Sequence, residues 1–565
     1  MNTHAIPTAR FDHRKYAPAP TVQLSNRTWP DNPISKAPLW CSVDLRDGNQ
    51  ALIEPMSVEQ KCQLFSLLVE VGFKEIEVGF PAASQPDFDF VRRLIDENRV
   101  PKDVTIQVLT QCRDALITRT FEALQGARCA TVHLYNSTSK VQREQVFKSD
   151  KKGITALAVA GAKQVLACAQ KQTNTQWQFQ YSPESFTCTE LDYAVEICNA
   201  INAVWQPTLE NPVIINLPAT VEVASPNVYA DQIEWFCRHI QNRDSLIISL
   251  HTHNDRGCGV AAAELGVMAG ADRVEGTLLG NGERTGNMDI ITMAMNLYSQ
   301  GIDPALNLAD MSRIIQVVEQ CTAIAVHPRH PYAGELVYTA FSGSHQDAIR
   351  KCIAMYELKH GLEHDSAQPW EVAYLPIDPR DLGRNYEEII RINSQSGKGG
   401  VAFLLEQHSG LQLPRWLQIE FSQVVQHETE NIGGEISANA VWQTFEQTYL
   451  AKQDWLLERF QLEKQPSGTN YCHATLTLAG ENVDIQGSGN GLLESVVNAL
   501  QEQFAIPIDI VEYSEHALTE GTDSRAVAYI KVRSGDLYGY GVAIHQDTLS
   551  SSINALLKAT QQIRG

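Results

Sequence analysis

From Leu39 to Leu278 the chain alternates short apolar runs with longer amphipathic segments. Short apolar runs rich in β-branched residues are typical of buried strands. The expected strands are Leu39–Asp44, Glu75–Gly79, Thr105–Leu109, Ala130–Leu134, Trp177–Tyr181, Val213–Leu217, Leu246–His251 and Arg273–Leu278. Between them the apolar residues recur at helical spacing, which predicts helices such as Val58–Val71 (with Ser57 as its N-cap), Glu190–Val204 and Tyr229–Asn242.

Eight successive strand-and-helix units predict an α/β fold, a (β/α)8 TIM barrel spanning residues 39–326 as the catalytic domain. A doubly wound open sheet is the alternative. No G-x-G-x-x-G opens a helix after the first strand, which weighs against a dinucleotide-binding version of that sheet. Residues 1–38 are polar and predict an N-terminal extension with little regular structure, anchored by Trp29 and Pro30.

The chain after the barrel divides into two further regions. Residues 327–465 predict a mostly helical linker region, with Val441–Arg459 as its clearest helix. Residues 466–565 predict a C-terminal α+β domain. Its expected elements are the strands Tyr471–Leu478, Ile508–Tyr513, Ala526–Arg533 and Tyr538–His545, and the helices Leu492–Phe504 and Leu549–Gln562. Two similar strand-then-helix ends, Asp484–Phe504 and Tyr540–Gln562, suggest an internal duplication.

Composition narrows the choice of partners. With 45 Lys and Arg against 66 Asp and Glu, the net charge of −21 argues against nucleic acid or an anionic membrane as a main partner. An anionic substrate therefore needs a local cation or a metal ion. No apolar run approaches the roughly 20 residues of a membrane span. The N-terminus lacks the apolar core of a signal peptide, and the 12 scattered cysteines form no C-x-x-C pair, which favours a cytoplasmic location.

Polar residues gather where the predicted barrel strands end. In a TIM barrel these C-terminal ends form one mouth, and the active site lies there. His251 and His253 point the same way because strand side chains alternate between faces. Closure of the barrel places the first, seventh and eighth strands side by side, so that Asp47, His251, His253 and Asn287 could meet around one divalent cation. The simpler alternative is a pair of core histidines and separate loop residues.

Three motifs resemble those of the DRE-TIM metallolyases: Leu45–Gln50, His251–Asp255 and Gly280–Asn287. Within that family the chain resembles the 2-isopropylmalate synthases in their long form, which carries a C-terminal regulatory domain. Phe341–Asp347 and Tyr374–Pro379 resemble this long form in particular. The resemblance extends over nearly the whole chain from about Trp29.

The resemblance implies a Claisen condensation of acetyl-CoA with 2-oxoisovalerate, followed by hydrolysis of the thioester. This is the committed step of leucine biosynthesis, and leucine is the expected inhibitor. The implied ligands of the divalent metal are Asp47, His251, His253 and Asn287. An oxygen and nitrogen site suits Mg²⁺, Mn²⁺ and Zn²⁺ alike. The resemblance also implies a monovalent cation such as K⁺ as an activator, and a homodimer.

The remaining roles combine residue chemistry with the resemblance. Arg46 could stabilise the oxyanion that forms on the keto acid. His133, Ser182 and Thr220 lie at strand ends, where they could hydrogen-bond this substrate. The other expected site residues are Glu184 and His345 as candidate bases, Tyr374 near them, Glu283 as a residue that orients a ligand or Arg46, and Gly489, Asn490, Asp523 and Ala526 near the effector.

The choice of base stays open at this stage, although the resemblance favours His345 of the partner subunit, supported by Glu184. Arg284 is expected to make a structural ion pair. The Gly-rich stretch Gly487–Gly491 is either a small-ligand site or an ordinary turn.

Three alternative functions remain. A sibling synthase such as citramalate or homocitrate synthase would use another 2-keto acid, and the latter would need a cation for a second carboxylate. Keto-acid selectivity rests on few contacts, because one methylene is worth only about 1–3 kcal/mol. A lyase such as hydroxymethylglutaryl-CoA lyase would run the reverse reaction, but feedback control by a C-terminal domain fits a biosynthetic step better. A catalytically silent metabolite-binding regulator would have lost some of the metal ligands, Arg46 or His345.

Overall fold

The computed structural model describes residues 13–19, 21–340, 342–361, 368–384, 398–432, 438–451, 454–466, 468–478, 480–518 and 524–564. The chain forms two compact units. The first consists of Met1–Val337 with Arg380–Arg384, and the second of Tyr338–Pro379 with Asn385–Gly565. Across the described residues, no helix is both long and apolar enough to cross a membrane.

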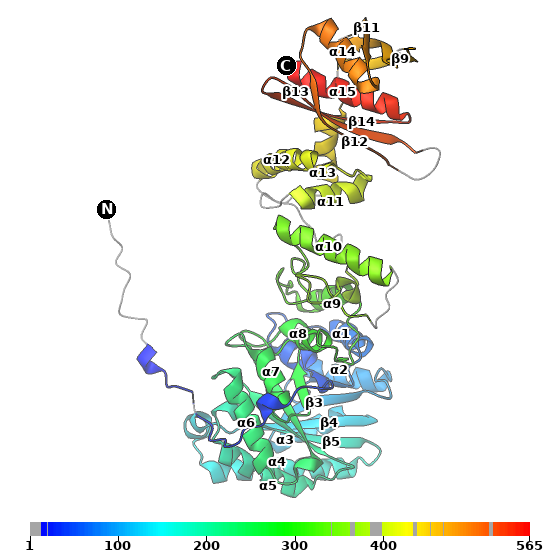
Figure 1. Cartoon of the computed structure of the whole chain (residues 1–565). Helices are drawn as coiled ribbons and strands as arrows, with labels where there is room; N and C mark the ends of the chain where they lie inside the picture. The colour runs from blue at the N-terminus through cyan, green and yellow to red at the C-terminus, as the bar shows by residue number, and fades with distance from the viewer. Residues whose placement is uncertain are drawn as a thin grey trace, which may run out of the picture. The chain divides into compact units, whose positions relative to one another are not determined.

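The first unit is a closed barrel of eight parallel strands with helices around it (Figure 1). The strands are hydrogen-bonded in sequence order and β1 pairs with β8, so the predicted TIM barrel is confirmed. The strands are β1 (Leu39–Ser42), β2 (Glu75–Gly79), β3 (Thr105–Gln111), β4 (Cys129–Ser137), β5 (Gln176–Glu184), β6 (Val213–Ala219), β7 (Leu246–Thr252) and β8 (Arg273–Gly276).

Each strand leads into helical structure. The helices are α1 (Val58–Val71), α2 (Gln85–Asp96), α3 (Asp114–Ala123), α4 (Lys151–Lys171), α5 (Leu191–Trp205), α6 (Pro226–His239), α7 (Gly259–Met268), α8 (Ile290–Tyr298) and α9 (Met311–Thr322). Ser57 caps α1 as expected: its hydroxyl accepts the backbone N–H of Gln60, whose side chain in turn accepts the N–H of Ser57.

Short helical turns complete the first unit. They are η1 (His13–Lys15), η2 (Trp29–Asp31), η3 (Asp44–Gly48), η4 (Gln142–Phe147), η5 (Phe186–Cys188), η6 (Arg243–Ser245) and η7 (Leu278–Gly280). The first strand ends at Ser42, two residues before the expected end, because Asp44 already belongs to the η3 turn. The buried Asp44 carboxylate accepts the backbone N–H of Leu278 at 3.1 Å, which ties η3 to the chain leaving β8. This turn carries the first site residues.

The N-terminal extension is held against α6 by polar contacts. The Arg27 guanidinium pairs with Asp231 at 2.6 Å, and the Trp29 indole N–H donates to the same carboxylate at 2.8 Å. The backbone N–H of Thr28 donates to Glu234 at 2.9 Å. Trp29 therefore anchors the extension, as its position among polar residues suggested.

The turn η8 (Pro379–Leu382) begins in the second unit and continues into the residues of the first. The second unit contains the remaining elements. They are α10 (Gly343–His360), α11 (Lys398–Ser409), α12 (Arg415–Ile432), α13 (Ala438–Phe445), η10 (Glu446–Leu450), β9 (Trp455–Lys464), β10 (Asn470–Leu478), β11 (Glu481–Gly489), α14 (Leu492–Phe504), β12 (Asp509–Ala517), β13 (Ala526–Ser534), β14 (Leu537–His545) and α15 (Thr548–Arg564). β9–β11 and β12–β14 form two three-stranded antiparallel sheets, each followed by a helix, so the topology contains the suggested duplication.

The expected helix Val441–Arg459 is wrong in its second half. Helix α13 ends at Phe445, the η10 turn follows, and Arg459 lies inside strand β9. β9 pairs with β10 along its length, and Trp455 is buried against Phe504 with ring centroids 4.9 Å apart. Sheet pairing and core packing thus override the local helical pattern.

The Gly-rich stretch before α14 has a packing role. Gly487 and Gly489 lie in β11, and a Cβ on Gly487 would stand 2.4 Å from the carbonyl oxygen of Ser495. In the second repeat a Cβ on Gly541 would stand 1.9 Å from the carbonyl oxygen of Ala555. These glycines let each helix lie directly on its sheet.

Strand β13, at the centre of the sheet β12–β14, is buried on both faces. Ala528, Ile530 and Val532 on β13 pack in a core with α14 and α15. The alternate residues Val527 and Tyr529 face a second core, formed with the described parts of α11, α12 and α13. Helices α11, α12 and α13 of the linker region therefore share this second core with the C-terminal domain.

Candidate active site

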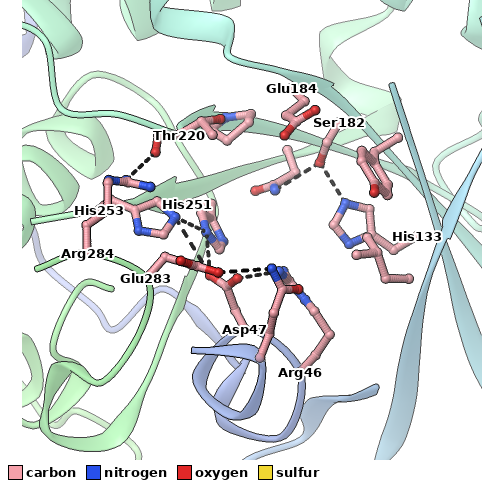
Figure 2. A pocket seen from close by; sticks show the side chains of 15 residues that line it. Arg46, Asp47, His133, Ser182, Glu184, Thr220, His251, His253, Glu283 and Arg284 are labelled. Carbon is pink, nitrogen blue, oxygen red and sulfur yellow. Dashed lines mark hydrogen bonds and ion pairs between the residues drawn. The ribbon is translucent and has the colours of Figure 1, made fainter. Parts of the chain in front are cut away.

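The mouth of the barrel brings together an acidic residue and two histidines. Asp47 lies in the η3 turn after β1, whereas His251 lies on β7 and His253 directly follows it. The Oδ2 atom of Asp47 is 3.3 Å from Nε2 of His251 and 3.7 Å from Nε2 of His253. All three side chains are buried, and Figure 2 shows them converging beside Arg46. Their ligand atoms lie within 4.8 Å of one another, the arrangement of a metal site.

The polar atoms of this cluster are incompletely satisfied. Among the described residues, Asp47 Oδ2 and Asn287 Oδ1 are buried without a hydrogen-bond partner. The Nε2 atoms of the two histidines face each other at 3.3 Å, where at most one proton fits between them. Asn287 pairs with His253 through its backbone, and its amide N–H donates to the carbonyl of Asn281 at 3.0 Å, which leaves Oδ1 as a free acceptor. Buried acceptors without donors fit a bound cation.

Charge interactions set the protonation of this cluster. Burial alone would raise the pKa of Asp47, but the Arg46 guanidinium and the histidines hold that pKa far below its ordinary value. Burial opposes the charged form of His251 as well, yet the nearby carboxylates of Asp47 and Glu275 raise its pKa to about 9. Burial and the neighbouring His251 lower the pKa of His253 to about 4. One carboxylate and one neutral imidazole are therefore available to a cation.

Arg46 is fixed in the cavity by two carboxylates. Its Nη1 lies 2.7 Å from Asp47 Oδ1, and its Nε donates to Glu77, a fully buried residue of β2. Burial disfavours the cation, but these two carboxylates raise the pKa of Arg46 above its ordinary value. A permanent positive charge is thus held beside the cluster of Asp47, His251 and His253.

A second polar group lies across the cavity on β4, β5 and β6. Nε2 of His133 is 2.7 Å from the Ser182 hydroxyl, which also accepts a hydrogen bond from the Asn216 amide at 3.0 Å. Nδ1 of His133 is 2.7 Å from Glu77 Oε2, so this histidine is oriented from both sides. His133, Ser182 and Asn216 line a cavity of about 290 Å³. Its lining also includes Leu109, Tyr135 and Pro218.

Glu184 and Thr220 line the same cavity at its outer rim. The Ser137 hydroxyl donates to the Glu184 carboxylate. The Thr220 hydroxyl accepts the backbone N–H of Ser185 at 2.9 Å, so it partly serves to shape the loop after β5.

Glu283 and Arg284 also reach the cavity, but their partners lie in neighbouring loops. Glu283 accepts from the Gln50 amide at 3.2 Å, whereas Arg46 is held by Glu77 instead of the expected Glu283. Arg284 forms the expected ion pair, with its Nε 2.6 Å from Asp255 Oδ1.

Inside the barrel, in contact with His251, lies a buried charged network that sequence analysis missed. Glu275 on β8 lies 3.0 Å from Nδ1 of His251, 2.8 Å from Arg273 and 2.8 Å from the Gln180 amide. Arg273 in turn donates to Gln107 at 2.9 Å. The sequence does contain a signal for this network. Two of the strands predicted to be buried each carry two charged residues at a spacing of two: Glu75 and Glu77 in one, Arg273 and Glu275 in the other. That spacing places both members of a pair on the same face of the strand, here inside the barrel.

The other expected site residues belong to the second unit. His345 on α10 stacks on Tyr374, with ring centroids 4.0 Å apart and an interplanar angle of 25°. Gly489 and Asn490 lie at the end of β11, where the Asn490 carbonyl accepts from Asn470 at 2.9 Å.

Ala526 begins β13 on the other sheet and pairs with Ala517 and His545. Asp523 lies outside the described residues. Among the described residues expected near the effector, Gly489 and Ala526 thus lie in two different sheets.

Three family models match successive parts of the chain. An HMGL-like domain matches residues 37–318, an alpha-isopropylmalate synthase post-catalytic domain matches residues 335–406, and a LeuA allosteric (dimerisation) domain matches residues 435–564. A curated relative from Rhodospirillum rubrum, named 2-isopropylmalate synthase, is 55% identical over 97% of this chain and 98% of its own length. A relative of the same name from Alcanivorax borkumensis is 53% identical over 98% of both chains.

Proposed function

The chain belongs to the 2-isopropylmalate synthase family, and on this premise we propose how the mouth of its barrel carries out the family's reaction. It is an acyltransferase of leucine biosynthesis that forms 2-isopropylmalate, with a regulatory domain at its C-terminal end. The observation that supports the catalytic proposal best is the convergence of Asp47, His251 and His253.

We propose acetyl-CoA and 2-oxoisovalerate as the substrates. The methyl carbon of the acetyl group loses a proton and forms a bond to the keto carbon, and water then cleaves the thioester to release CoA. A divalent cation at this site would polarise the keto group as a Lewis acid. Asp47, His251, His253 and Asn287 would hold it, and their oxygen and nitrogen ligands suit Mg²⁺, Mn²⁺ or Zn²⁺. K⁺ as an activator is part of the same proposal.

The keto acid would lie between the proposed metal ligands and the polar side chains of His133, Ser182 and Asn216. The Ser182 hydroxyl and the Asn216 amide already share a hydrogen bond, so they can present a fixed polar edge to the carboxylate. Thr220 stands at the rim of the same cavity. Leu109, Tyr135 and Pro218 supply the apolar surface against which a branched alkyl group would pack.

Arg46 would stabilise the charge that develops on the former keto oxygen. Its guanidinium is held in place before substrate arrives, because Asp47 and Glu77 fix its two edges. A preorganised cation of this kind lowers the barrier without having to reorient during the reaction.

The base that removes the methyl proton would be His345 of the partner subunit, with Tyr374 stacked on it and with Glu184 in support. The stacking at 4.0 Å would fix the plane of the imidazole ring. Glu184 lines the cavity directly and is the alternative base.

Regulation and assembly are proposed from the C-terminal half. The LeuA allosteric (dimerisation) domain supports a homodimer and a regulatory ligand, and we propose that this ligand is leucine. Gly489, Asn490, Asp523 and Ala526 remain the proposed effector residues. The 12 free cysteines are consistent with the proposed cytoplasmic location.

The direct test is release of free CoA thiol from acetyl-CoA. Pyruvate, 2-oxobutyrate, 2-oxoisovalerate and 2-oxoglutarate are offered separately, with and without EDTA and leucine. We expect strong preference for 2-oxoisovalerate, loss of activity with EDTA and suppression by leucine. Preference for another keto acid would move the enzyme to a sibling reaction, and release that persists in EDTA would overturn the metal proposal.

A further inference from the structure

Lys61 is a buried cation that lies outside the catalytic cavity. It belongs to helix α1 on the outside of the barrel, and only 1% of its surface is exposed. Its Nζ lies 2.5 Å from Asp87 Oδ1 on α2 and donates to the backbone carbonyl of Leu45 at 3.2 Å. Apolar side chains of similar volume would join two helices at lower cost than a buried ion pair. Helix packing alone therefore does not explain this buried ion pair, which indicates a further role for it.

Asp87 uses its second oxygen to hold another segment. Oδ2 accepts the backbone N–H of Phe80 at 2.8 Å, directly after β2 ends. A Cβ on Gly79 would stand 2.8 Å from this same oxygen, so glycine is needed for the carboxylate to approach so closely. The Lys61–Asp87 pair thus contacts the backbone at two points.

Both of these points adjoin residues of the active site. Leu45 directly precedes Arg46 and Asp47 in the η3 turn. Gly79 and Phe80 follow Glu77, the carboxylate that holds Arg46. One buried ion pair therefore connects the segment that carries Arg46 with the segment that carries Glu77, its carboxylate partner.

We propose that Lys61 and Asp87 are positioning residues that fix the η3 turn, and so hold Arg46 and Asp47 in place for metal and substrate. Neither side chain lines the cavity, so both act through the backbone. The proposal rests on the metal centre proposed above. Small displacements of ligand-bearing segments weaken metal binding, and loss of a supporting contact commonly costs about 10–100-fold in affinity.

The test compares Mn²⁺ affinity, measured by electron paramagnetic resonance, in the full-length wild type and in Lys61→Met. Methionine keeps most of the volume and removes the charge. We expect a folded variant whose Mn²⁺ affinity is about 10–100-fold lower, with kcat reduced alongside. Asp87→Asn, a smaller change that keeps the shape of the side chain, is expected to shift Mn²⁺ affinity in the same direction and serves if Lys61→Met does not fold.

Arg143→Met is the matched control. Arg143 is also a buried cation that pairs with a carboxylate, Glu190, and donates to a backbone carbonyl, that of Thr138. It lies after β4, away from η3. We expect this variant to lose thermal stability while it keeps wild-type Mn²⁺ affinity.

The outcomes separate the two proposals. Unchanged Mn²⁺ affinity and kcat in folded Lys61→Met and Asp87→Asn would show that the pair is only structural. Equal loss of affinity in Arg143→Met would also overturn the positioning role, because any buried charge would then have the same effect. A wild type that binds no Mn²⁺, Mg²⁺ or Zn²⁺ would overturn the metal centre itself and remove the basis of the positioning role.

Discussion

The Glu275 carboxylate lies 3.0 Å from Nδ1 of His251, on the side of the ring opposite Asp47. This contact fixes the ring plane and directs Nε2 toward the cavity. Glu275→Gln keeps an acceptor but removes its charge, so we expect Mn²⁺ affinity to fall by about 10–100-fold. Glu264→Gln is the control, because Glu264 lies on α7 and its carboxylate accepts a hydrogen bond from the Asn296 amide on α8. Wild-type affinity in Glu275→Gln would contradict the role.

Replacement of Arg46 by lysine should reduce turnover more than binding. Lysine keeps the charge but cannot reach Asp47 and Glu77 together, as the guanidinium does. We expect kcat in the thiol-release assay to fall by about 10²–10³-fold with little change in KM. Arg284→Lys, at a cation that lines the same cavity but pairs with Asp255, should have a much smaller effect on kcat. Equal losses in the two variants would argue against a specific role for Arg46.

A smaller side chain at position 109 should enlarge the space for the keto acid's alkyl group. Leu109 is buried and, like Pro218, lines the cavity. For Leu109→Ala we expect the ratio of kcat/KM for 4-methyl-2-oxopentanoate to that for 2-oxoisovalerate to rise by about 10- to 200-fold. Val221→Ala, at an exposed position after β6, provides the comparison. An unchanged ratio in Leu109→Ala would place the alkyl group elsewhere.

The stability of the second unit should depend on pH through Lys558. Burial lowers the pKa of this lysine from 10.5 to about 8, and its Nζ donates to the Tyr449 carbonyl at 3.0 Å. Between about pH 8 and 10.5 the unfolded chain binds a proton that the folded chain has released, so stability should rise with pH across this window. Below pH 8 both states carry the proton, and the full cost of burying it is present.

The measurement for Lys558 is the urea midpoint of the second unit at several pH values. Lys558→Met removes the buried charge, so we expect a higher midpoint at pH 7 and the loss of the wild-type rise between pH 8 and 10. The difference between the two proteins isolates Lys558 from other groups that titrate in this range. Parallel pH profiles for wild type and variant would refute the assignment.

The sequence by itself determined the eight strand-and-helix units of the barrel. Their signal is local, because apolar residues at a period of two or 3.6 reveal which face of a strand or helix is buried. It also predicted that Asp47, His251 and His253 would lie close together, since barrel closure fixes which strand ends are neighbours. The helix predicted through Arg459 failed because a strand pairing with β10 and the burial of Trp455 against Phe504 outweigh local propensity.

Only the tertiary structure decided which residues support the site. Glu275 meets His251, and Lys61 meets the Leu45 carbonyl, across elements that no local pattern relates. The sequence marks Arg273 and Glu275 as charges on one face of a strand, but a buried charge reveals its partner only once the chain has folded around it. The proposed metal ligands follow from the order of the strands, whereas their orientation depends on packing between distant parts of the chain.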